Sequence, residues 1–430
     1  MDNGQCGHRV RIRPPSGVQT VVVGLGLTLR AIATAHRGRL RMVTVSSPRS
    51  IVPTKWPADH RIRLFLPQTM AACVETAAAA IRDPDAAARP TRKRVRVAMG
   101  NAGDYEETCR LGEGSFGAVV KARHRGTGEP VAIKHLGAAL GGHGALLREA
   151  QLLEASGRDN PFVAGLHGLA RDPSTMALSL VMEYVGPSLR DLHLRRRRSW
   201  TPLALPEATV RAAMWQLLTG ASKMHERRVI HRDIKPSNVL VGEGANNLGV
   251  VKICDFGLAM SMDEPPPYDP AGTLRYMAPE MLLEKPEYDE RVDAWSLGCV
   301  MAELVNGWSP FQGLNEEGQL CAIFDVLGFP DGATWPWFTS TAFAAVFMAE
   351  PGMQRRNLLR EHFPEKKLSK DGFEVLSGLL TCNPEKRLTA AAALEHPWFA
   401  KVDALELPKR EEVASTLPKR RRVLCVCDDF

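Results

Sequence analysis

One run of polar residues, set between apolar segments, constrains this chain more than any other feature. It reads His231-Arg232-Asp233-Ile234-Lys235-Pro236-Ser237-Asn238, and Asp255-Phe256-Gly257 follows after a further apolar stretch. The flanking apolar residues predict short strands, so the polar side chains fall in the loops between them. Carboxylate and amide oxygens are ligands that Mg²⁺ prefers. The run therefore favours a site that holds a metal ion and an anionic ligand.

A glycine-rich segment upstream supplies a second part of such a site. Its glycines follow the order G-x-G-x-x-G-x-V between apolar residues at strand spacing. Without Cβ atoms the backbone can fold tightly over phosphate oxygens and offer them its N–H groups. Alone, this pattern is a weak indication of phosphate binding. The segment consists of Leu111, Gly112, Glu113, Gly114, Ser115, Phe116, Gly117, Ala118 and Val119.

Lys134 and Glu149 extend the pattern. Lys134 ends the next apolar strand, where its ammonium can reach the same phosphates. The residues from Arg148 to Leu153 read as a helix, and Glu149 lies beside its apolar face, within reach of an ion pair with Lys134. Taken singly, each of the two is more often an ordinary solvated charge. The functional interpretation depends on their pairing with the glycine-rich segment.

Taken in chain order, the motifs resemble those of protein kinases. The set comprises the glycine-rich loop, the strand lysine, the helix glutamate, the His-Arg-Asp loop with its asparagine, Asp-Phe-Gly, and Ala278-Pro279-Glu280. The resemblance implies an α+β, bilobal kinase domain at 104–400, with a small β-rich N-lobe at 104–184 and a larger α-helical C-lobe at 185–400. It also implies a serine/threonine protein kinase that uses ATP and Mg²⁺ and acts on protein substrates.

The resemblance assigns catalytic and metal-binding roles. Phosphoryl transfer in this family needs little covalent chemistry but much positioning and charge neutralisation. Asp233 corresponds to the carboxylate that orients the substrate hydroxyl and accepts its proton, while Asn238 and Asp255 correspond to the Mg²⁺ ligands. Lys235 corresponds to a lysine that contacts the γ-phosphate in serine/threonine kinases, and Thr273 to the threonine that braces Asp233 and Lys235.

The same resemblance implies the other nucleotide contacts. Lys134, braced by Glu149, contacts the α- and β-phosphates. The segment Leu180–Val185 forms the hinge whose backbone reads the adenine edge, with Met182 guarding the back pocket. Further along, Arg387 corresponds to the partner of Glu280. The adenine contacts are assigned to Leu111, Val119, Ala132 and Leu240, and to Glu183 and Val185 of the hinge.

Within the family, three segments resemble cyclin-dependent-kinase-like kinases of the CMGC group, and a plant cyclin-dependent kinase of the F type in particular. They are Gly112–Gly117, Thr273–Glu280 and Gln319–Asp331. This resemblance implies a role in the cell cycle or in transcription. The cyclin-contacting motif of the group aligns with His143–Glu149, where only the last two residues agree. A cyclin partner is therefore an open alternative.

The segment from Ser261 to Thr273, here the activation segment, departs from the family pattern. Tyr268 stands where an activating threonine is usual. Of the three arginines with which the family grips the phosphate, Arg148 and Arg232 are present, and Met260 stands in the third position. Tyr268 and the two arginines are therefore candidates for a regulatory role.

Acidic residues of the activation segment suggest an unphosphorylated alternative. We hypothesise that Asp269, or Asp263 and Glu264, meets the two-arginine pocket and orders the segment without threonine phosphorylation. The prolines of the segment would reduce its entropy in the unfolded state. A loosely ordered acidic loop is the competing interpretation.

Two further positions bear on specificity and control. Gly272 occupies the position where this group accommodates a proline after the target residue, because glycine adopts positive φ at little cost. Met277 stands where proline-directed kinases usually have an arginine, yet we still predict proline-directed specificity. In the glycine-rich loop Phe116 removes an inhibitory tyrosine, while Ser115 keeps a hydroxyl and is a regulatory candidate.

The flanks differ from the region between them in charge. The net charge is +7, yet residues 1–100 hold 17 Lys and Arg against 5 Asp and Glu, so the remainder is net acidic. Residues 1–100 are predicted to be a disordered basic extension and residues 401–430 a basic tail. Short basic clusters at Arg89–Arg94 and Pro418–Val423 favour the nucleus and/or cytoplasm, with solvated charge as the alternative. A signal-like or transit-like pattern near the start leaves organelle targeting as a minor alternative.

Several other functions are disfavoured. No apolar stretch reaches the roughly 18 residues of a membrane helix, so we expect no membrane association. No basic stripe with interleaved aromatic residues lies between the flanks, so we expect no direct nucleic-acid binding. A pseudokinase or scaffold that binds partners without phosphoryl transfer is the main alternative to an enzyme, but no member of the catalytic set is missing.

Overall fold

The computed structural model describes residues 97–114, 117–136, 142–197, 204–242, 249–347 and 356–401, together with three strands nearer the N-terminus. The chain divides into two units, 1–89 and 90–430. In the first unit an antiparallel sheet has the order β1-β2-β3, which the sequence did not predict. The other predictions for the flanks, including both basic clusters, concern residues outside those that the structure describes. The strands are β1 (Gln19–Val21), β2 (Arg30–His36) and β3 (Arg39–Val45).

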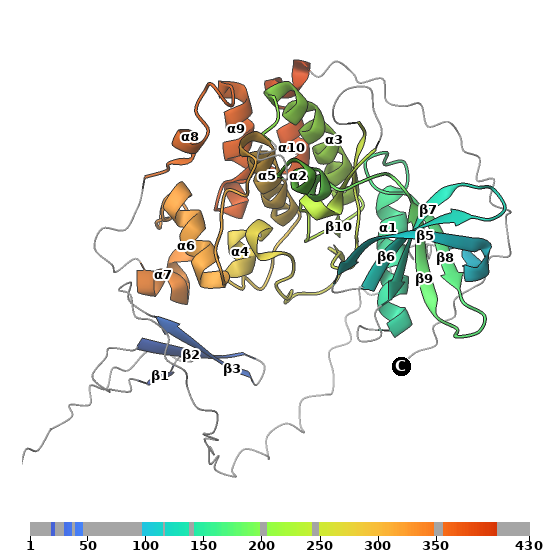
Figure 1. The fold of residues 1–430 in the computed structure, drawn as a ribbon. Helices are drawn as coiled ribbons and strands as arrows, with labels where there is room; N and C mark the ends of the chain where they lie inside the picture. The colour runs from blue at the N-terminus through green and yellow to red at the C-terminus, as the bar shows by residue number, and fades with distance from the viewer. Residues whose placement is uncertain are drawn as a thin grey trace, which may run out of the picture. The chain divides into compact units, whose positions relative to one another are not determined.

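A six-stranded sheet and one helix form the β-rich lobe of the second unit (Figure 1). The strand order is β4-β8-β9-β7-β6-β5, and every neighbouring pair is antiparallel except β4 and β8. The elements are β4 (Met99–Asn101), β5 (Tyr105–Gly114), β6 (Gly117–His124), β7 (Pro130–Leu136), α1 (Gly142–Gly157), β8 (Leu166–Arg171) and β9 (Leu178–Glu183).

Alternation along the strands gives this sheet two apolar faces. Val131, Ile133 and Val181 belong to a small cluster on one face, whereas Leu180 and Met182, the neighbours of Val181 in β9, join the main core. Leu146, Ala150 and Leu153 of α1 are buried in that main core, at the helical spacing expected for one face. The sheet is therefore fixed against α1 on one side.

The predicted start of the kinase domain at residue 104 leaves out β4. Met99 to Asn101 pair in parallel with Leu169 to Arg171 of β8 and so extend the sheet by one strand. Three residues are too few to form a periodic pattern, so this strand could not be predicted from the sequence.

The second lobe is helical and surrounds α5 (Figure 1). Its helices are α2 (Leu189–Arg197), α3 (Glu207–His225), α4 (Pro279–Leu282), α5 (Arg291–Asn306), α6 (Glu316–Leu327), α7 (Ala342–Phe347), α8 (Leu359–His362), α9 (Lys370–Leu379) and α10 (Ala390–Leu394). Two short hairpins accompany them: β10 (Val229–Ile230) with β13 (Met260–Ser261), and β11 (Val239–Val241) with β12 (Val251–Ile253). Single turns of 3₁₀ helix occur at Ala102–Asp104, Pro236–Asn238, Leu274–Tyr276, Phe338–Ser340, Pro384–Lys386 and Pro397–Lys401.

Helix α5 is the centre of the helical lobe. Every residue from Val292 to Asn306 is buried, so the helix has no solvent face. It ends at Gly307, whose left-handed backbone (φ 86°) lets its N–H donate to the carbonyl oxygen of Glu303 at 2.7 Å. One continuous core joins α5 to α1, β9, α3 and α9. The bilobal α+β fold predicted from the motifs is thereby confirmed.

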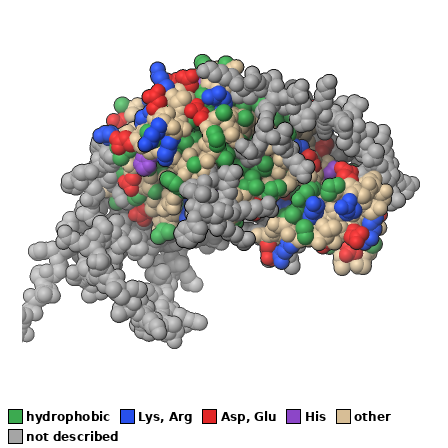
Figure 2. Space-filling model, turned by 45° about the horizontal axis from the view of Figure 1, so that its top comes forward, with side chains coloured by type: hydrophobic (Ala, Val, Ile, Leu, Met, Phe, Trp, Pro, Cys, Tyr) green, Lys and Arg blue, Asp and Glu red, His purple; other side chains and the backbone are tan. Residues whose placement is uncertain are grey.

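The surface mixes charges of both signs. Figure 2 shows Lys and Arg side chains interspersed with Asp and Glu over the described part of the face in view. Of the helices that the structure describes, none combines the length and apolar character needed to cross a membrane.

Candidate active site

The predicted ion pair between Lys134 and Glu149 is present and buried. The Nζ of Lys134 donates to Oε1 of Glu149 and to Oδ1 of Asp255, both at 2.7 Å. Lys134 and Glu149 expose only 4% and 5% of their surface, so Glu149 is not the solvated helix charge of the competing interpretation. Burial lowers the pKa of Lys134, but the carboxylates of Asp255 and Glu149 outweigh it, and the pKa is raised. The lysine therefore stays a cation at neutral pH.

Asp255 is positioned between this lysine and the loop of Asp233. Burial acts to raise the pKa of Asp255, but the charge and hydrogen bond of Lys134 lower it further than burial raises it. The backbone of Asp255 has a left-handed φ of 66°, which is uncommon for a residue with a side chain. An ionised carboxylate in a constrained backbone is suited to ligate a metal ion.

The Asp233 carboxylate lies in a closed hydrogen-bond network. The hydroxyl of Thr273 donates to its Oδ1 at 2.7 Å, and Lys235 donates to its Oδ2 at 2.7 Å. The Nδ2 of Asn238 also donates to Oδ2, at 3.1 Å, and Lys235 donates to the Thr273 hydroxyl at 2.7 Å. Sequence reasoning predicted that Thr273 braces Asp233 and Lys235, and the structure brings these groups together. The orientation of the carboxylate is therefore fixed by three donors.

His231 joins the two polar loops. Its Nε2 lies 3.0 Å from the carbonyl oxygen of Cys254, which can only accept, so Nε2 carries the proton. Its Nδ1 then accepts from the backbone N–H of Asp233 at 3.2 Å. The imidazole ring also packs edge-on against Phe256, with 4.9 Å between the ring centroids. A single histidine thus holds the loop of Asp233 next to that of Asp255.

Asp293 is a functional residue that sequence reasoning missed. It is fully buried in α5, and its carboxylate accepts from the backbone N–H groups of His231 and Arg232, each at 2.8 Å. His225 lies 2.9 Å away through Nε2. Burial acts to raise the pKa of Asp293, but the hydrogen bond and charge of His225 lower it. The signal in the sequence was an aspartate near the start of a mainly apolar helix.

Asp293 also accounts for the strained backbone of the loop. Arg232 has a φ of 67°, a conformation that costs a residue with a side chain about 1–3 kcal/mol. Because both adjacent N–H groups are satisfied by one buried carboxylate, the surrounding structure can hold this conformation. Asp293 is thus a positioning residue for the loop that carries Asp233.

Helix α5 holds a second segment of the site as well. Ser296 donates through its hydroxyl to the carbonyl oxygen of Tyr276 at 2.8 Å, and the Tyr276 hydroxyl donates to Oε2 of Glu303 at 2.7 Å. Burial raises the pKa of Tyr276 well above its ordinary value, and Glu303 raises it further. Tyr276 therefore remains a neutral donor, and the segment that follows Thr273 is tied to the same helix as the loop of Asp233.

The residues predicted to contact adenine come from adjacent strands. Val119 is paired with Lys134 across β6 and β7, and Ala132 is paired with Met182 across β7 and β9. Leu240 bridges to Ser188, just after the predicted hinge. Leu111 is 41% exposed on β5. The structure thus places Val119, Ala132 and the hinge around Lys134, while the nucleotide contacts themselves stay a prediction.

The glycine-rich segment forms a β-hairpin. Gly112 pairs with Val119, Glu113 with Ala118, and Gly114 with Gly117. The regulatory candidate Ser115 and its neighbour Phe116 lie outside the described residues.

The side chain of Glu183 is engaged in hydrogen bonds within the protein. Its carboxylate oxygens accept from Lys252 at 2.6 and 2.8 Å, and Oε2 also accepts from the backbone N–H of Gly165 at 2.9 Å. Any contact of Glu183 with adenine must therefore come from its backbone. Val185 follows two residues later in the hinge.

The predicted partnership of Glu280 and Arg387 is confirmed as a buried, two-pronged ion pair. Nη1 and Nη2 of Arg387 donate to the two oxygens of Glu280 at 2.6 and 2.7 Å. The two residues expose only 3% and 1% of their surface. The guanidinium also lies over the Trp295 ring of α5, 5.1 Å from its centroid.

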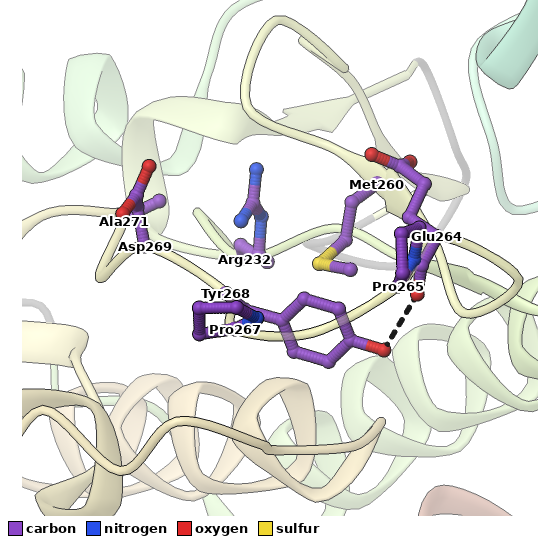
Figure 3. Close-up of a pocket in the computed structure, with 8 residues that line it drawn as sticks. All are labelled: Arg232, Met260, Glu264, Pro265, Pro267, Tyr268, Asp269 and Ala271. Carbon is purple, nitrogen blue, oxygen red and sulfur yellow. Dashed lines mark hydrogen bonds between the residues drawn. The ribbon is translucent and has the colours of Figure 1, made fainter. Parts of the chain in front are cut away.

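The activation segment confirms one of its predicted contacts and corrects another. Glu264 accepts from Nη2 of Arg148 at 2.6 Å. Asp263 instead accepts from Nε of Arg228 at 2.6 Å, because residue 262 pairs with the backbone of Arg228 and brings Asp263 to that side. Asp269 lies at the edge of the pocket in Figure 3, and its carbonyl oxygen accepts from Tyr288 at 2.8 Å. The segment is held by specific contacts, unlike a loosely ordered loop.

Replacing Lys134 with Met should lower kcat/KM for ATP by about 100-fold, since removing one positioned donor from a transition state typically costs this much. The lysine is the one cation that contacts both Glu149 and Asp255 among the described ion pairs. Lys223→Met, which removes a half-buried lysine that donates to the carbonyl oxygen of Asp159, is the matched control. Steady-state kinetics on both variants provides the measurement, and equal rates for the two would contradict the assigned role.

Comparison with known proteins is consistent with this geometry. The family described as "Protein kinase domain" matches residues 105–399. A rice protein (Oryza sativa subsp. japonica) named "Putative cyclin-dependent kinase F-2" is 45% identical over 311 residues, which is 70% of this chain and 90% of the relative. Cyclin-dependent kinase G1 of Arabidopsis thaliana is 37% identical over 77% of this chain, which spans 54% of that relative. Serine/threonine-protein kinase ppk23 of Schizosaccharomyces pombe is 33% identical over 74% of this chain and 77% of its own length.

Proposed function

Because the chain belongs to the protein kinase family, as a serine/threonine kinase of the cyclin-dependent-kinase-like group, we propose that it transfers the γ-phosphate of Mg²⁺-bound ATP to Ser or Thr residues of proteins through the site around Asp233. The observation that carries this proposal is the closed network of Asp233, Lys235, Asn238 and Thr273, next to the Lys134–Asp255 pair. These groups supply a carboxylate for the acceptor hydroxyl and cations for the phosphates, which the reaction requires.

In this proposal Asp233 receives the proton of the acceptor hydroxyl as that oxygen attacks the γ-phosphorus, while the bond from phosphorus to the bridging oxygen of the β-phosphate breaks and ADP leaves. The Thr273 and Lys235 contacts hold the carboxylate in a fixed orientation, so the acceptor is positioned before transfer. Lys235 is shared between Asp233 and Thr273, and in this proposal its positive charge would meet the γ-phosphate. Lys134 would neutralise the α- and β-phosphates.

The residues present fit a magnesium ion. The amide nitrogen of Asn238 donates to the backbone oxygen and the carboxylate of Asp233, so its amide oxygen is directed the other way. That oxygen and the Asp255 carboxylate are the two protein ligands we propose. No group of three or more His, Cys, Asp or Glu ligands occurs among the described residues. Mg²⁺ commonly takes one or two protein oxygens and completes its shell with phosphates and water.

The direct test is phosphate transfer from labelled ATP to a basic protein, with the wild-type chain beside Asp233→Asn. We expect label on Ser and Thr from the wild type, and loss of transfer when Mg²⁺ is chelated. Binding of ATP with no transfer by either protein would favour the pseudokinase alternative and sink the proposal.

Proline-directed specificity is the finer proposal. Gly272 has a φ of 121°, and a Cβ there would lie 2.4 Å from the carbonyl oxygen of Arg232, so only glycine fits. Met277 is buried, 3.4 Å from the same Cβ position, and gives this region an apolar wall.

On a degenerate peptide array we expect proline after the acceptor residue to be favoured about tenfold, the scale on which a small apolar pocket discriminates. Leu274→Ala, which alters a neighbouring side chain but leaves the Gly272 backbone, serves as the comparison. A flat profile at that position would contradict the proposal.

A cyclin-like partner and a nuclear or cytoplasmic location are proposals as well. The names of the F-type and G-type relatives support a cyclin partner. The first turn of α1, residues 142–145, is exposed and so accessible to a partner, although its sequence departs from the cyclin-contacting motif. Affinity purification of the tagged chain followed by identification of bound proteins tests the first proposal. Microscopy of variants that lack the basic cluster at 89–94 or at 418–423 tests the second.

A further inference from the structure

Helix α1 carries two adjacent charged residues with different partners. Glu149 points into the core and binds Lys134, as described above. Arg148 is exposed and binds Glu264 of the activation segment, with 2.6 Å between Nη2 and Oε1. One helical turn therefore connects the activation segment to the lysine of the nucleotide site. A change at Glu264 can reach Lys134 through two neighbouring residues.

Glu264 is built into the segment as an anion. Its Oε1 also accepts from the backbone N–H of Ser261 at 2.8 Å. Burial acts to raise the pKa of Glu264, but the hydrogen bonds from Arg148 and Ser261 and the charges of Arg148 and Arg232 lower it. The carboxylate is therefore ionised across the neutral pH range.

The pocket beside Glu264 is lined by one arginine, Arg232, which already donates hydrogen bonds within the protein. Arg232 donates through Nε to the carbonyl oxygen of Leu258 at 2.7 Å and through Nη1 to the Tyr288 hydroxyl at 2.9 Å. Figure 3 shows Arg232 and the apolar side chain of Met260 above the Tyr268 ring, with Glu264 at one side. The pocket has a volume of about 230 Å³ and is lined by Arg232, Met260, Glu264, Pro265, Pro267, Tyr268, Asp269 and Ala271.

Tyr268 is used structurally rather than as an exposed acceptor. Its hydroxyl donates to the carbonyl oxygen of Glu264 at 3.0 Å, and its backbone N–H donates to the carbonyl oxygen of Pro286 at 2.9 Å. Its ring packs edge-on against Tyr288, with 5.2 Å between the centroids. A phosphate on Tyr268 would remove the donated hydrogen bond and place about two negative charges beside Glu264. The contacts around Tyr268 thus fit the unphosphorylated residue.

We propose that Glu264 is a positioning residue: its carboxylate, in place of a phosphate on the segment, holds Arg148 and thereby sets helix α1 for the Lys134–Glu149 pair. This inference rests on the proposed function, because it concerns the same phosphoryl-transfer site. The kinase is then active without phosphorylation of the activation segment. Removing the charge of Glu264 weakens catalysis although Glu264 touches neither ATP nor the acceptor.

The test uses the full chain, with transfer to a basic protein measured before and after phosphatase treatment and with the phosphorylation state of residues 261–276 checked by mass spectrometry. We expect the wild type to keep its activity after phosphatase. Glu264→Gln should lower kcat/KM about five- to tenfold, the scale of coupling between linked sites. Asp263→Asn, which removes the neighbouring carboxylate that binds Arg228, should change it less than about twofold, as for an exposed ion pair.

A double-mutant cycle separates positioning from a general loss of structure. If Glu264 acts through Arg148, Glu264→Gln combined with Arg148→Gln should be no worse than either single variant, because the pair can be lost only once. Additive losses would overturn the inference, as would loss of wild-type activity after phosphatase or a Glu264→Gln variant as active as the wild type. No transfer by the wild type, before or after phosphatase, would instead count against the proposed function itself.

Discussion

Asp233→Asn is expected to lower kcat by about 1,000-fold while the affinity for ATP changes little. The substitution keeps the shape of the side chain but removes the ability to accept a proton, and a positioned general base typically contributes 10²–10⁴-fold. It also disturbs the network, because Lys235 and Asn238 both donate to Oδ2 of Asp233. An amide NH₂ at that position would face two donors and have nothing to accept its own hydrogen bonds.

Single-turnover kinetics with saturating ATP, together with a nucleotide-binding titration, measure the two quantities separately. Asp159→Asn is the matched control, because Asp159 is an aspartate outside the network and its left-handed backbone tolerates asparagine. Its rate should equal that of the wild type. A general base contributes at least about 100-fold, so its removal should cost at least that much. If Asp233→Asn retains more than about a tenth of the wild-type rate, the role assigned to Asp233 is wrong.

Arg387→Ala should destabilise the protein by about 3–5 kcal/mol, the usual cost of removing one partner from a buried ion pair. The guanidinium donates to both oxygens of Glu280 and to the carbonyl oxygens of Thr381, Cys382 and Arg291. Without it, the Glu280 carboxylate is left buried without its cation. For a helical lobe of this size such a loss lowers the melting temperature by roughly 10 °C.

Differential scanning fluorimetry measures this shift. Arg110→Ala breaks an ion pair with Glu113 whose side chains are 57% and 70% exposed, so it should cost less than about 1 kcal/mol. Arg387→Lys should fall between the two, because an ammonium cannot form the two parallel bonds of a guanidinium. Equal melting temperatures for Arg387→Ala and Arg110→Ala would show that the buried pair does not support the lobe.

The grouping of the residues assigned to the nucleotide site was predictable, because the chemistry of the ligand that we propose for them dictates their type and order. Lys134 and Glu149 were identified from their places on a strand and a helix, and the structure joins them. The same holds for Asp233 with Lys235 and Thr273. A reaction that needs oxygen ligands for a metal and cations for phosphates leaves few alternatives for these positions.

Residues that act through the fold were harder to predict. Asp293 accepts hydrogen bonds from the backbone N–H groups of His231 and Arg232, and His231 lies 62 positions earlier in the chain. No local pattern in the sequence encodes a contact over that separation. The choice of Asp263 for Arg228 and of Glu264 for Arg148 depends on the backbone pairing of residue 262 with Arg228. Strand β4 is too short to leave a periodic trace. In each case the outcome is decided by tertiary placement, which a linear pattern does not contain.

The dependence of the acceptor side on α5 has a mechanical consequence. Asp293 holds the loop of Asp233, while Ser296 and Glu303 hold Tyr276. The two segments proposed to position the acceptor are therefore both bonded to the same helix. Separation of the lobes to discharge ADP would break the bonds from Lys134 to Asp255 and from Arg148 to Glu264, which bridge the two lobes. The contacts of α5 with the loop of Asp233 and with Tyr276 would persist through the turnover cycle. Only the contacts that bridge the lobes, at Lys134 and Arg148, would need to form again.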